Sequence, residues 1–151
     1  MKKWTEEMLR GEGYRVWNAV IKNVDLVFDE YGYIHSKLLL DGHGLCVDYG
    51  ASHILGIKTE NNTEYGKNSK FSCTSAGMEA IMRILDTIGE DNYCNLKGKY
   101  VRVATKGWGS VVNIIGNILD DKWFDYGSFF DDMKNDTADD KGTEVIWRRN
   151  T

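Results

Sequence analysis

Residues 14–40 read YRVWNAVIKNVDLVFDEYGYIHSKLLL, and this stretch indicates the fold class most clearly. Apolar and polar side chains alternate over residues 14–28, and this alternation predicts a long strand. Its apolar face is expected to carry Val20, Val24, Leu26 and Phe28, with Lys22 as an interruption. The turn residues 29–32 follow, and residues 33–40 predict a second strand. A second turn at 41–44 and a short apolar run at 45–49 predict a third strand, which makes an antiparallel meander.

A polar stretch and then a helix follow the meander. Residues 56–70 are rich in Asn, Lys and Glu without apolar periodicity, so they predict an exposed loop. Thr74 or Ser75 can then cap a helix that ends at Gly89. Its apolar positions recur with helical spacing, and they are Met78, Ile81, Met82, Leu85 and Ile88.

The last part of the chain predicts a second hairpin and a second helix. Residues 99–105 and 110–119 have strand character and are joined through residues 106–109. The alternation places Tyr100, Arg102 and Ala104 on the face opposite Val101, Val103 and Thr105. Residues 122–133 predict a short aromatic-rich helix, and residues 145–147 a final short strand.

These elements predict an α+β fold. The expected architecture is an antiparallel sheet of about five strands with one main amphipathic helix and a C-terminal aromatic-rich helix. A chain of 151 residues with 42% hydrophobic and 28% charged residues fits one domain, 1–151. Within it we expect an N-terminal arm at 1–12 that contains a short helix capped by Thr5, a core at 13–133 and a polar C-terminal tail at 134–151.

Composition and charge favour a cytoplasmic protein that acts away from membranes and duplex DNA. No apolar run is long enough to cross a bilayer. There are three cysteines, an odd number, and they lie far apart in the sequence, which fits reduced thiols better than a set of disulfides. The net charge of −4 removes the broad attraction that drives nonspecific binding to duplex DNA.

The segment 43–53 gathers side chains that zinc or a nucleophilic relay would use, among them His43, Cys46 and His53. Their spacing matches neither a zinc motif nor a catalytic pair, so a strand that ends in a glycine turn is the alternative. Gly50 would allow close approach of a ligand, or would form a bulge. Nothing else in the sequence forms a catalytic motif. We therefore expect no enzyme, no catalytic residues, no metal and no cofactor.

A basic and aromatic group on the second hairpin suits a phosphate and a base. Ammonium and guanidinium groups neutralise phosphates, and aromatic faces stack on bases. The group comprises Lys97, Lys99, Arg102, Lys106 and Trp108, with Tyr100 and Asn113 nearby. Charged strand edges that resist aggregation have the same composition, so that alternative stays open.

An aromatic cluster and several acids share the region 121–132. The aromatic residues are Trp123, Phe124, Tyr126, Phe129 and Phe130, interleaved with Asp121, Asp125, Asp131 and Asp132. The rings are expected in the core, or alternatively in an oligomer seam. The acids are expected to be solvated, or alternatively to imitate the phosphates of a nucleic acid.

Three runs of the sequence resemble small phage and prophage accessory proteins. They are SAGMEAIMRILDTIG at 75–89, LKGKYVRV at 96–103 and IGNILDDKWF at 115–124, and the similarity covers residues 16–130. Tyr49-Gly50-Ala51 stands where that group has a glycine-rich strand end, in reduced form. The resemblance implies a protein that counters bacterial defence, by binding a protein effector or by sequestering a nucleotide immune signal.

The leading hypothesis is a non-catalytic phage anti-defence protein that binds and sequesters a nucleotide-derived immune signal between the subunits of a homo-oligomer. Arg102, Lys106 and Trp108 would supply charge and stacking, and Tyr49, Gly50 and His53 would shape the pocket. One alternative is an acidic inhibitor that binds a host defence nuclease, as anti-CRISPR proteins do, through Asp125, Asp131, Asp132 and the C-terminal tail. Another is an accessory protein that binds single-stranded nucleic acid.

Overall fold

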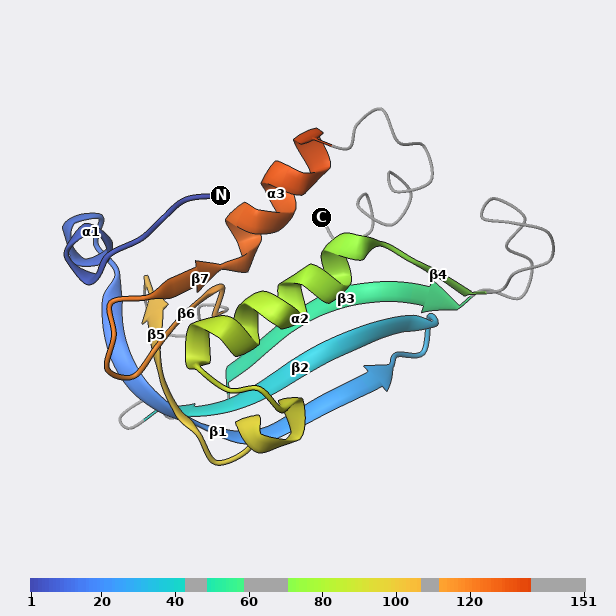
Figure 1. The fold of residues 1–151 in the computed structure, drawn as a ribbon, viewed down its shortest axis with the longest axis horizontal. Coiled ribbons are helices and arrows are strands. Elements are labelled where there is room, and N and C mark those ends of the chain that lie inside the picture. The colour runs from blue at the N-terminus through green and yellow to red at the C-terminus, as the bar shows by residue number, and fades with distance from the viewer. Residues whose placement is uncertain (43–48, 59–70, 107–111, 137–151) are drawn as a thin grey trace.

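The computed structural model describes residues 1–42, 49–58, 71–106 and 112–136. These residues form an α+β fold with one seven-stranded antiparallel sheet, in the order β4-β3-β2-β1-β5-β6-β7 (Figure 1). The strands are β1 (Arg15–Phe28), β2 (Tyr33–Gly42), β3 (Tyr49–Lys58), β4 (Phe71–Cys73), β5 (Tyr100–Thr105), β6 (Ile114–Gly116) and β7 (Trp123–Asp125). The helices are α1 (Glu6–Gly11), α2 (Ser75–Ile88), the 3-10 turn η1 (Tyr93–Leu96) and α3 (Tyr126–Asp136). The expected fold class is confirmed, with more strands than the five expected.

The β1–β2 hairpin forms as expected, and Asp29 organises its turn. Its Oδ1 accepts hydrogen bonds from the backbone N–H groups of Tyr31 and Tyr33 at 2.8 and 3.0 Å. Its Oδ2 lies 2.7 Å from Nε2 of His35. Burial raises the pKa of the Asp29 carboxyl, but the hydrogen bonds from His35, Tyr33 and Tyr31 outweigh it and the net pKa is lowered. The folded chain therefore stabilises the charged form of Asp29.

A lowered pKa makes the stability of the hairpin depend on pH. The contribution of the Asp29 charge is complete above the ordinary pKa of 3.8 and is lost as the pH falls through the lower pKa of the folded state. We expect Asp29→Asn, which keeps the Oδ1 acceptor, to lower the free energy of unfolding at neutral pH, and the difference in this free energy from wild type to narrow towards pH 2. Urea titrations at several pH values test this, with Asp91→Asn at an exposed position as control. If the difference in stability between Asp29→Asn and wild type stays constant down to pH 2, the charge of Asp29 does not stabilise the hairpin.

A bulge at Lys22 changes the face assignment of β1. Ile21 pairs with Leu40 of β2 and Asn23 with Leu39, so Lys22 is the additional residue. An additional residue shifts the alternation by one position. Val20 therefore lies on the face opposite Val24, Leu26 and Phe28, and the expectation that all four share a face was wrong. Lys22, the polar residue that interrupts the apolar pattern in the sequence, is the residue at which the bulge occurs.

The third strand extends farther than expected. β3 runs from Tyr49 to Lys58, so it includes Gly50, which pairs with Leu39, and residues 56–58 of the expected loop. β4, which was not expected, pairs with the end of β3. Residues 45–48 of the predicted strand, residues 59–70 of the predicted loop and residues 145–147 of the predicted final strand lie outside the described residues.

Helix α2 forms within its expected limits, but its buried face is only partly the expected one: Leu85 and Ile88 pack against the core, whereas Met78 and Met82 do not. Thr74 caps it by accepting a hydrogen bond from the N–H of Gly77, and Gly89 ends it with a φ of 84°. The buried residues are mostly small: Ala76, Gly77, Ala80, Ile84 and Thr87. A Cβ on Gly77 would lie 2.9 Å from the carbonyl oxygen of Leu55, so this glycine lets the helix approach β3 closely. Met78 and Met82 consequently stay exposed, at 59% and 55%.

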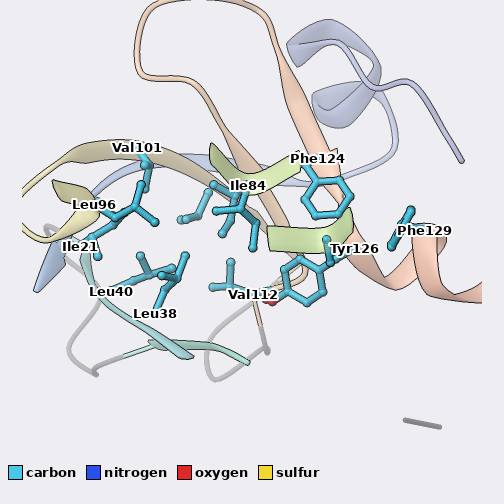
Figure 2. Close-up of a cluster of buried hydrophobic side chains, with 14 of the residues drawn as sticks. Ile21, Leu38, Leu40, Ile84, Leu96, Val101, Val112, Phe124, Tyr126 and Phe129 are labelled. Carbon is cyan, nitrogen blue, oxygen red and sulfur yellow. The ribbon is translucent and has the colours of Figure 1, made fainter. Parts of the chain in front are cut away.

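The core lies between the sheet and helices α2 and α3, which cover the same face (Figure 1). Figure 2 shows Ile21, Leu38 and Leu40 of the sheet pointing toward Ile84 of α2. The expected aromatic cluster is part of this core through Phe124, Tyr126 and Phe129. Its first residues, Trp123–Asp125, form strand β7 instead of the first turn of a helix, and α3 begins at Tyr126.

The N-terminal arm packs on the opposite face of the sheet. Thr5 caps α1, as expected. Trp4 and Leu9 are buried together with Ala104 of β5 and Ile114 of β6. This second small core fixes the arm beside β5, β6 and β7. Within the described ranges, none of the helices combines the length and the apolar character that crossing a bilayer demands.

Candidate functional site

A hollow of about 320 Å³ opens beside the N-terminal arm, where strands β5, β6 and β7 meet. Its lining comes from four separate segments of the chain. The lining residues are Tyr14, Ala104, Thr105, Lys106, Asn113, Ile114 and Asp125. Ala104 and Ile114 supply apolar walls, while an aromatic ring, an ammonium, an amide and a carboxylate converge on the same space. Small-molecule sites combine these properties, and their volumes begin at roughly 300 Å³.

Lys106 and Tyr14 form one wall of the hollow. The Lys106 ammonium lies 4.7 Å from the centroid of the Tyr14 ring. Trp4 packs edge-on against the same ring, with 5.6 Å between the ring centroids. Burial raises the pKa of Tyr14, and the charges of Asp125 and Glu12 add to this. Tyr14 therefore keeps its proton at neutral pH and presents a neutral hydroxyl group.

Asp125 also lines the hollow, and both of its carboxylate oxygens accept hydrogen bonds. Its Oδ2 accepts a hydrogen bond from Trp4 Nε1 at 3.0 Å, and its Oδ1 accepts one from the N–H of Ser128 at 3.0 Å. Each carboxylate oxygen can accept more than one hydrogen bond, so acceptor capacity remains. The first turn of α3 and the N-terminal arm thus fix a negative charge in the hollow.

Asn113 lies directly before β6, and its carbonyl oxygen accepts a hydrogen bond from the N–H of Tyr126. Gly127 is close by, because a Cβ built on it would lie 3.4 Å from Asp125 Oδ1 and 3.9 Å from the Asn113 side chain. The exposed Asn113 side chain therefore lies near the Asp125 carboxylate. The hydrogen bond to Tyr126 fixes the backbone of Asn113.

Arg102, the central residue of the predicted site, is engaged by its own chain. Nε donates to the carbonyl oxygen of Asn117 and one terminal nitrogen to that of Asp120, both at 2.7 Å. The other terminal nitrogen lies 3.3 Å from Glu6 Oε2, and the guanidinium stacks 4.7 Å from the Trp123 ring centroid. These contacts use three of the five N–H donors of the guanidinium, and only 12% of the side chain is exposed. Arg102 joins α1 to the β6–β7 turn.

The predicted site residues on β3 lie far from Lys106 within one chain. Tyr49, Gly50 and His53 lie on β3, where they pair with Leu40, Leu39 and Ser36 of β2. Strands β2 and β1 separate β3 from β5, a distance of about 14 Å at the usual strand spacing. Trp108 lies outside the described residues. Of the five predicted residues that the structure describes, only Lys106 is among the residues that line the hollow.

The remaining candidates are dispersed. Asp125 belongs to the hollow, Asp132 pairs with the N-terminal amine of Met1, and Asp131 is exposed. The three acids of the alternative protein-binding hypothesis therefore differ in their surroundings. His43 and Cys46 lie outside the described residues. Among the residues that the structure describes, no group of three His, Cys, Asp or Glu side chains is placed to hold a metal ion.

A second hollow of about 310 Å³ lies on the sheet face that α2 and α3 leave uncovered. Asn18, Val20, Asp41 and Tyr100 are among its lining residues. A carboxylate, an amide and a phenol meet there. The only cation that pairs with Asp41 in the described structure is Lys22, 3.7 Å away. This hollow suits an anionic ligand less well than the first, which contains Lys106.

Sequence reasoning missed Tyr14 and Asp125 as partners of Lys106. Tyr14 precedes the first strand and Asp125 ends the last one, and only the strand order β1-β5-β6-β7 brings them together. No short-range pattern encodes this order. The one available signal was the basic and aromatic composition of the second hairpin, which pointed to Lys106 and Asn113.

Comparison of the chain with protein-family models, with curated proteins and with solved structures gave no match.

Proposed function

We propose that the protein binds a small nucleotide-derived molecule in the hollow between Tyr14, Lys106, Asn113 and Asp125. The observation that supports this is the convergence of a cation, an aromatic ring, an amide and a carboxylate on about 320 Å³. A nucleotide presents the complementary groups, namely a phosphate, a flat ring system and a polar base edge. The volume corresponds to one nucleotide unit rather than a long strand.

Lys106 and Tyr14 supply the affinity in this proposal. The Lys106 ammonium already lies over the Tyr14 ring, so a base that stacks on this ring takes its place. The long, exposed Lys106 side chain then turns to the phosphate of the same ligand. The ammonium exchanges a cation–π contact for an ion pair.

Asp125 and Asn113 supply the specificity. A carboxylate accepts a hydrogen bond from an exocyclic amino group, and an amide both donates to and accepts from a base edge. The fixed charge of Asp125 repels a second phosphate and disfavours uracil, which has no amino group and whose N3–H lies between two carbonyl oxygens. The proposed ligand therefore has an amino-bearing base, such as adenine, guanine or cytosine, and its phosphate lies at the Lys106 side.

The biological role that fits this binding is sequestration. The resemblance to phage accessory proteins suggests that a bound nucleotide signal is withheld from a bacterial defence system in the cytoplasm, without chemical conversion. The proposal does not need the β3 residues Tyr49, Gly50 and His53, and it assigns Arg102 to the scaffold.

A thermal-stability panel of mononucleotides and cyclic nucleotides tests the proposal. A ligand that binds only the folded state adds about 2.7 kcal/mol at a concentration of 100 times its Kd. For a domain of this size, that corresponds to a shift of roughly 5–10 °C. We expect a shift with at least one amino-bearing nucleotide and a smaller one with the matched uridine nucleotide. No shift with any nucleotide would refute the proposal.

Two variants locate the binding. Lys106→Ala and Asn113→Ala should each weaken binding at least tenfold, as measured by isothermal titration calorimetry. Lys99→Ala is the matched control, because Lys99 precedes the same strand but pairs with Glu90 at 3.1 Å, away from the hollow. Equal losses from Lys99→Ala and Lys106→Ala would show that general charge, and not this hollow, attracts the ligand.

A further inference from the structure

Strand β1 has an open edge over its second half. β5 pairs with β1 from Arg15 to Val20, and the last bonds on that side join Ile21 to Gly98 and Lys99. β2 covers the other edge of β1 as far as Phe28. Among the described residues, no strand pairs with residues 23–28 on the side where β5 ends. Figure 1 shows the last part of β1 at the border of the sheet, with β2 beside it on one side only.

The backbone groups of this edge alternate in direction. The Asp29 N–H donates to the Tyr33 carbonyl oxygen, so Asp29 faces β2, while the N–H and C=O of Ile21 face away from β2. In an antiparallel pair, consecutive residues alternate between the two directions, and the bulge at Lys22 adds one residue. Whether the alternation is counted from Ile21 or from Asp29, the backbone N–H and C=O groups of Val24, Leu26 and Phe28 point away from β2, toward the open edge.

The same segment exposes apolar side chains. Leu26 is 57% exposed, and Val27 and Phe28 are each 42% exposed. At the start of the segment, η1 adjoins β1 and Val24 is half-buried with Tyr93 against the core. An open edge with outward N–H and C=O groups and exposed apolar residues is a template for another strand.

We propose that a second copy of this chain adds its own β1 to this edge, in antiparallel orientation about a two-fold axis at Leu26. This register places Leu26 opposite Leu26 and Val24 opposite Phe28, and these are the residues whose backbone groups point outward. Aliphatic and aromatic side chains then meet across the strands on one face. The two-fold pairing is closed, so it stops at a dimer.

The charges of Asp25 and Asp29 favour this register over the two registers shifted by one residue. An axis at Asp25 would place two Asp25 carboxylates opposite each other, and an axis at Val27 would place Asp25 opposite Asp29. Like charges directly opposite each other destabilise a strand pair. The axis at Leu26 places Asp25 opposite Val27 instead. A second copy is therefore a self-complementary occupant, whereas an unrelated strand would need a matching sequence.

Light scattering coupled to size exclusion, over a range of concentrations, tests the dimer. We expect the wild type to approach twice its mass of 17.2 kDa as its concentration rises to hundreds of micromolar. Leu26→Lys should remain monomeric with an unchanged circular dichroism spectrum, because two lysines would then face each other. Leu119→Lys, at a leucine that is 87% exposed elsewhere, is the matched control and should dimerise as the wild type does. A wild type that stays monomeric at all concentrations would overturn the proposal, and so would a Leu26→Lys variant that still dimerises.

Cysteine cross-linking tests the register, in a background where Cys46, Cys73 and Cys94 are serine. Leu26→Cys should form a disulfide-linked dimer under mild oxidation, because the two Cα atoms would lie about 5.5 Å apart. Phe28→Cys should not, because the two positions would lie four residues apart along the strands, about 13 Å. Equal cross-linking of both variants would contradict the axis at Leu26. This dimer does not involve the hollow, so either proposal can fail alone.

Discussion

Arg102→Ala is expected to lower the free energy of unfolding by about 3 kcal/mol. The change removes charge-assisted hydrogen bonds to two carbonyl oxygens and to Glu6, and a stacking contact with Trp123. It also leaves the carbonyl oxygens of Asn117 and Asp120 without this donor. Urea titration of the purified variant measures the loss.

Arg10→Ala provides the matched control for this prediction. Arg10 pairs with the same Glu6 at 3.1 Å, but its side chain is 57% exposed. Exposed ion pairs of this kind contribute less than about 1 kcal/mol. Arg102→Lys should recover only part of the stability, because an ammonium cannot reproduce the planar fork of the guanidinium. A loss below 1 kcal/mol for Arg102→Ala, similar to that for Arg10→Ala, would contradict the scaffold role and return Arg102 to the candidate ligand residues.

Phe124→Ala is expected to be the most destabilising single change, at about 3–5 kcal/mol. Phe124 is 2% exposed and lies in β7 opposite Ile115. Its ring packs edge-on against Phe129 of α3, with 5.6 Å between the centroids, and lies 6.1 Å from Tyr126. Truncation leaves a cavity where the sheet meets α3, and neither element can move to fill it without losing other contacts.

Chemical denaturation with near-UV circular dichroism measures this effect. Tyr31→Ala, at an aromatic residue that is 74% exposed, should change the free energy of unfolding by no more than about 0.5 kcal/mol. Phe124→Leu should cost less than the alanine change because it refills most of the volume. A Phe124→Ala variant with nearly wild-type stability would show that α3 does not depend on this ring for its position.

The fold was predictable where local signals dominate. The alternation in β1 and β2, the cap at Thr74 and the stop at Gly89 each act within a few residues, and each element formed where it was expected, apart from the bulge at Lys22 that shifts the faces of β1. The buried face of α2 was not predictable from hydrophobicity alone. Close contact with β3 selects the small residues Gly77 and Ala80, which leaves Met78 and Met82 outside. Tertiary packing thus overrode the apolar pattern.

The candidate site was predictable only in part, because it depends on strand order. Lys106 could be identified from the basic and aromatic character of its hairpin. Arg102 has the same character in the sequence, but the structure surrounds it with acceptors from α1 and the β6–β7 turn. Whether a cation faces a ligand or its own chain is decided by residues such as Glu6, 96 positions away.

An NMR titration is the decisive test of nucleotide binding in the hollow, since it reports where a ligand binds as well as whether it binds. Uniformly ¹⁵N-labelled protein would be titrated with the nucleotide that gives the largest thermal shift. We expect the strongest shift changes in the side-chain amide of Asn113 and in the backbone signals of Tyr14, Lys106 and Ser128. Shift changes centred on Tyr100 and Asp41 would place the ligand in the second hollow and contradict the proposed site, and a spectrum that does not change would contradict nucleotide binding itself.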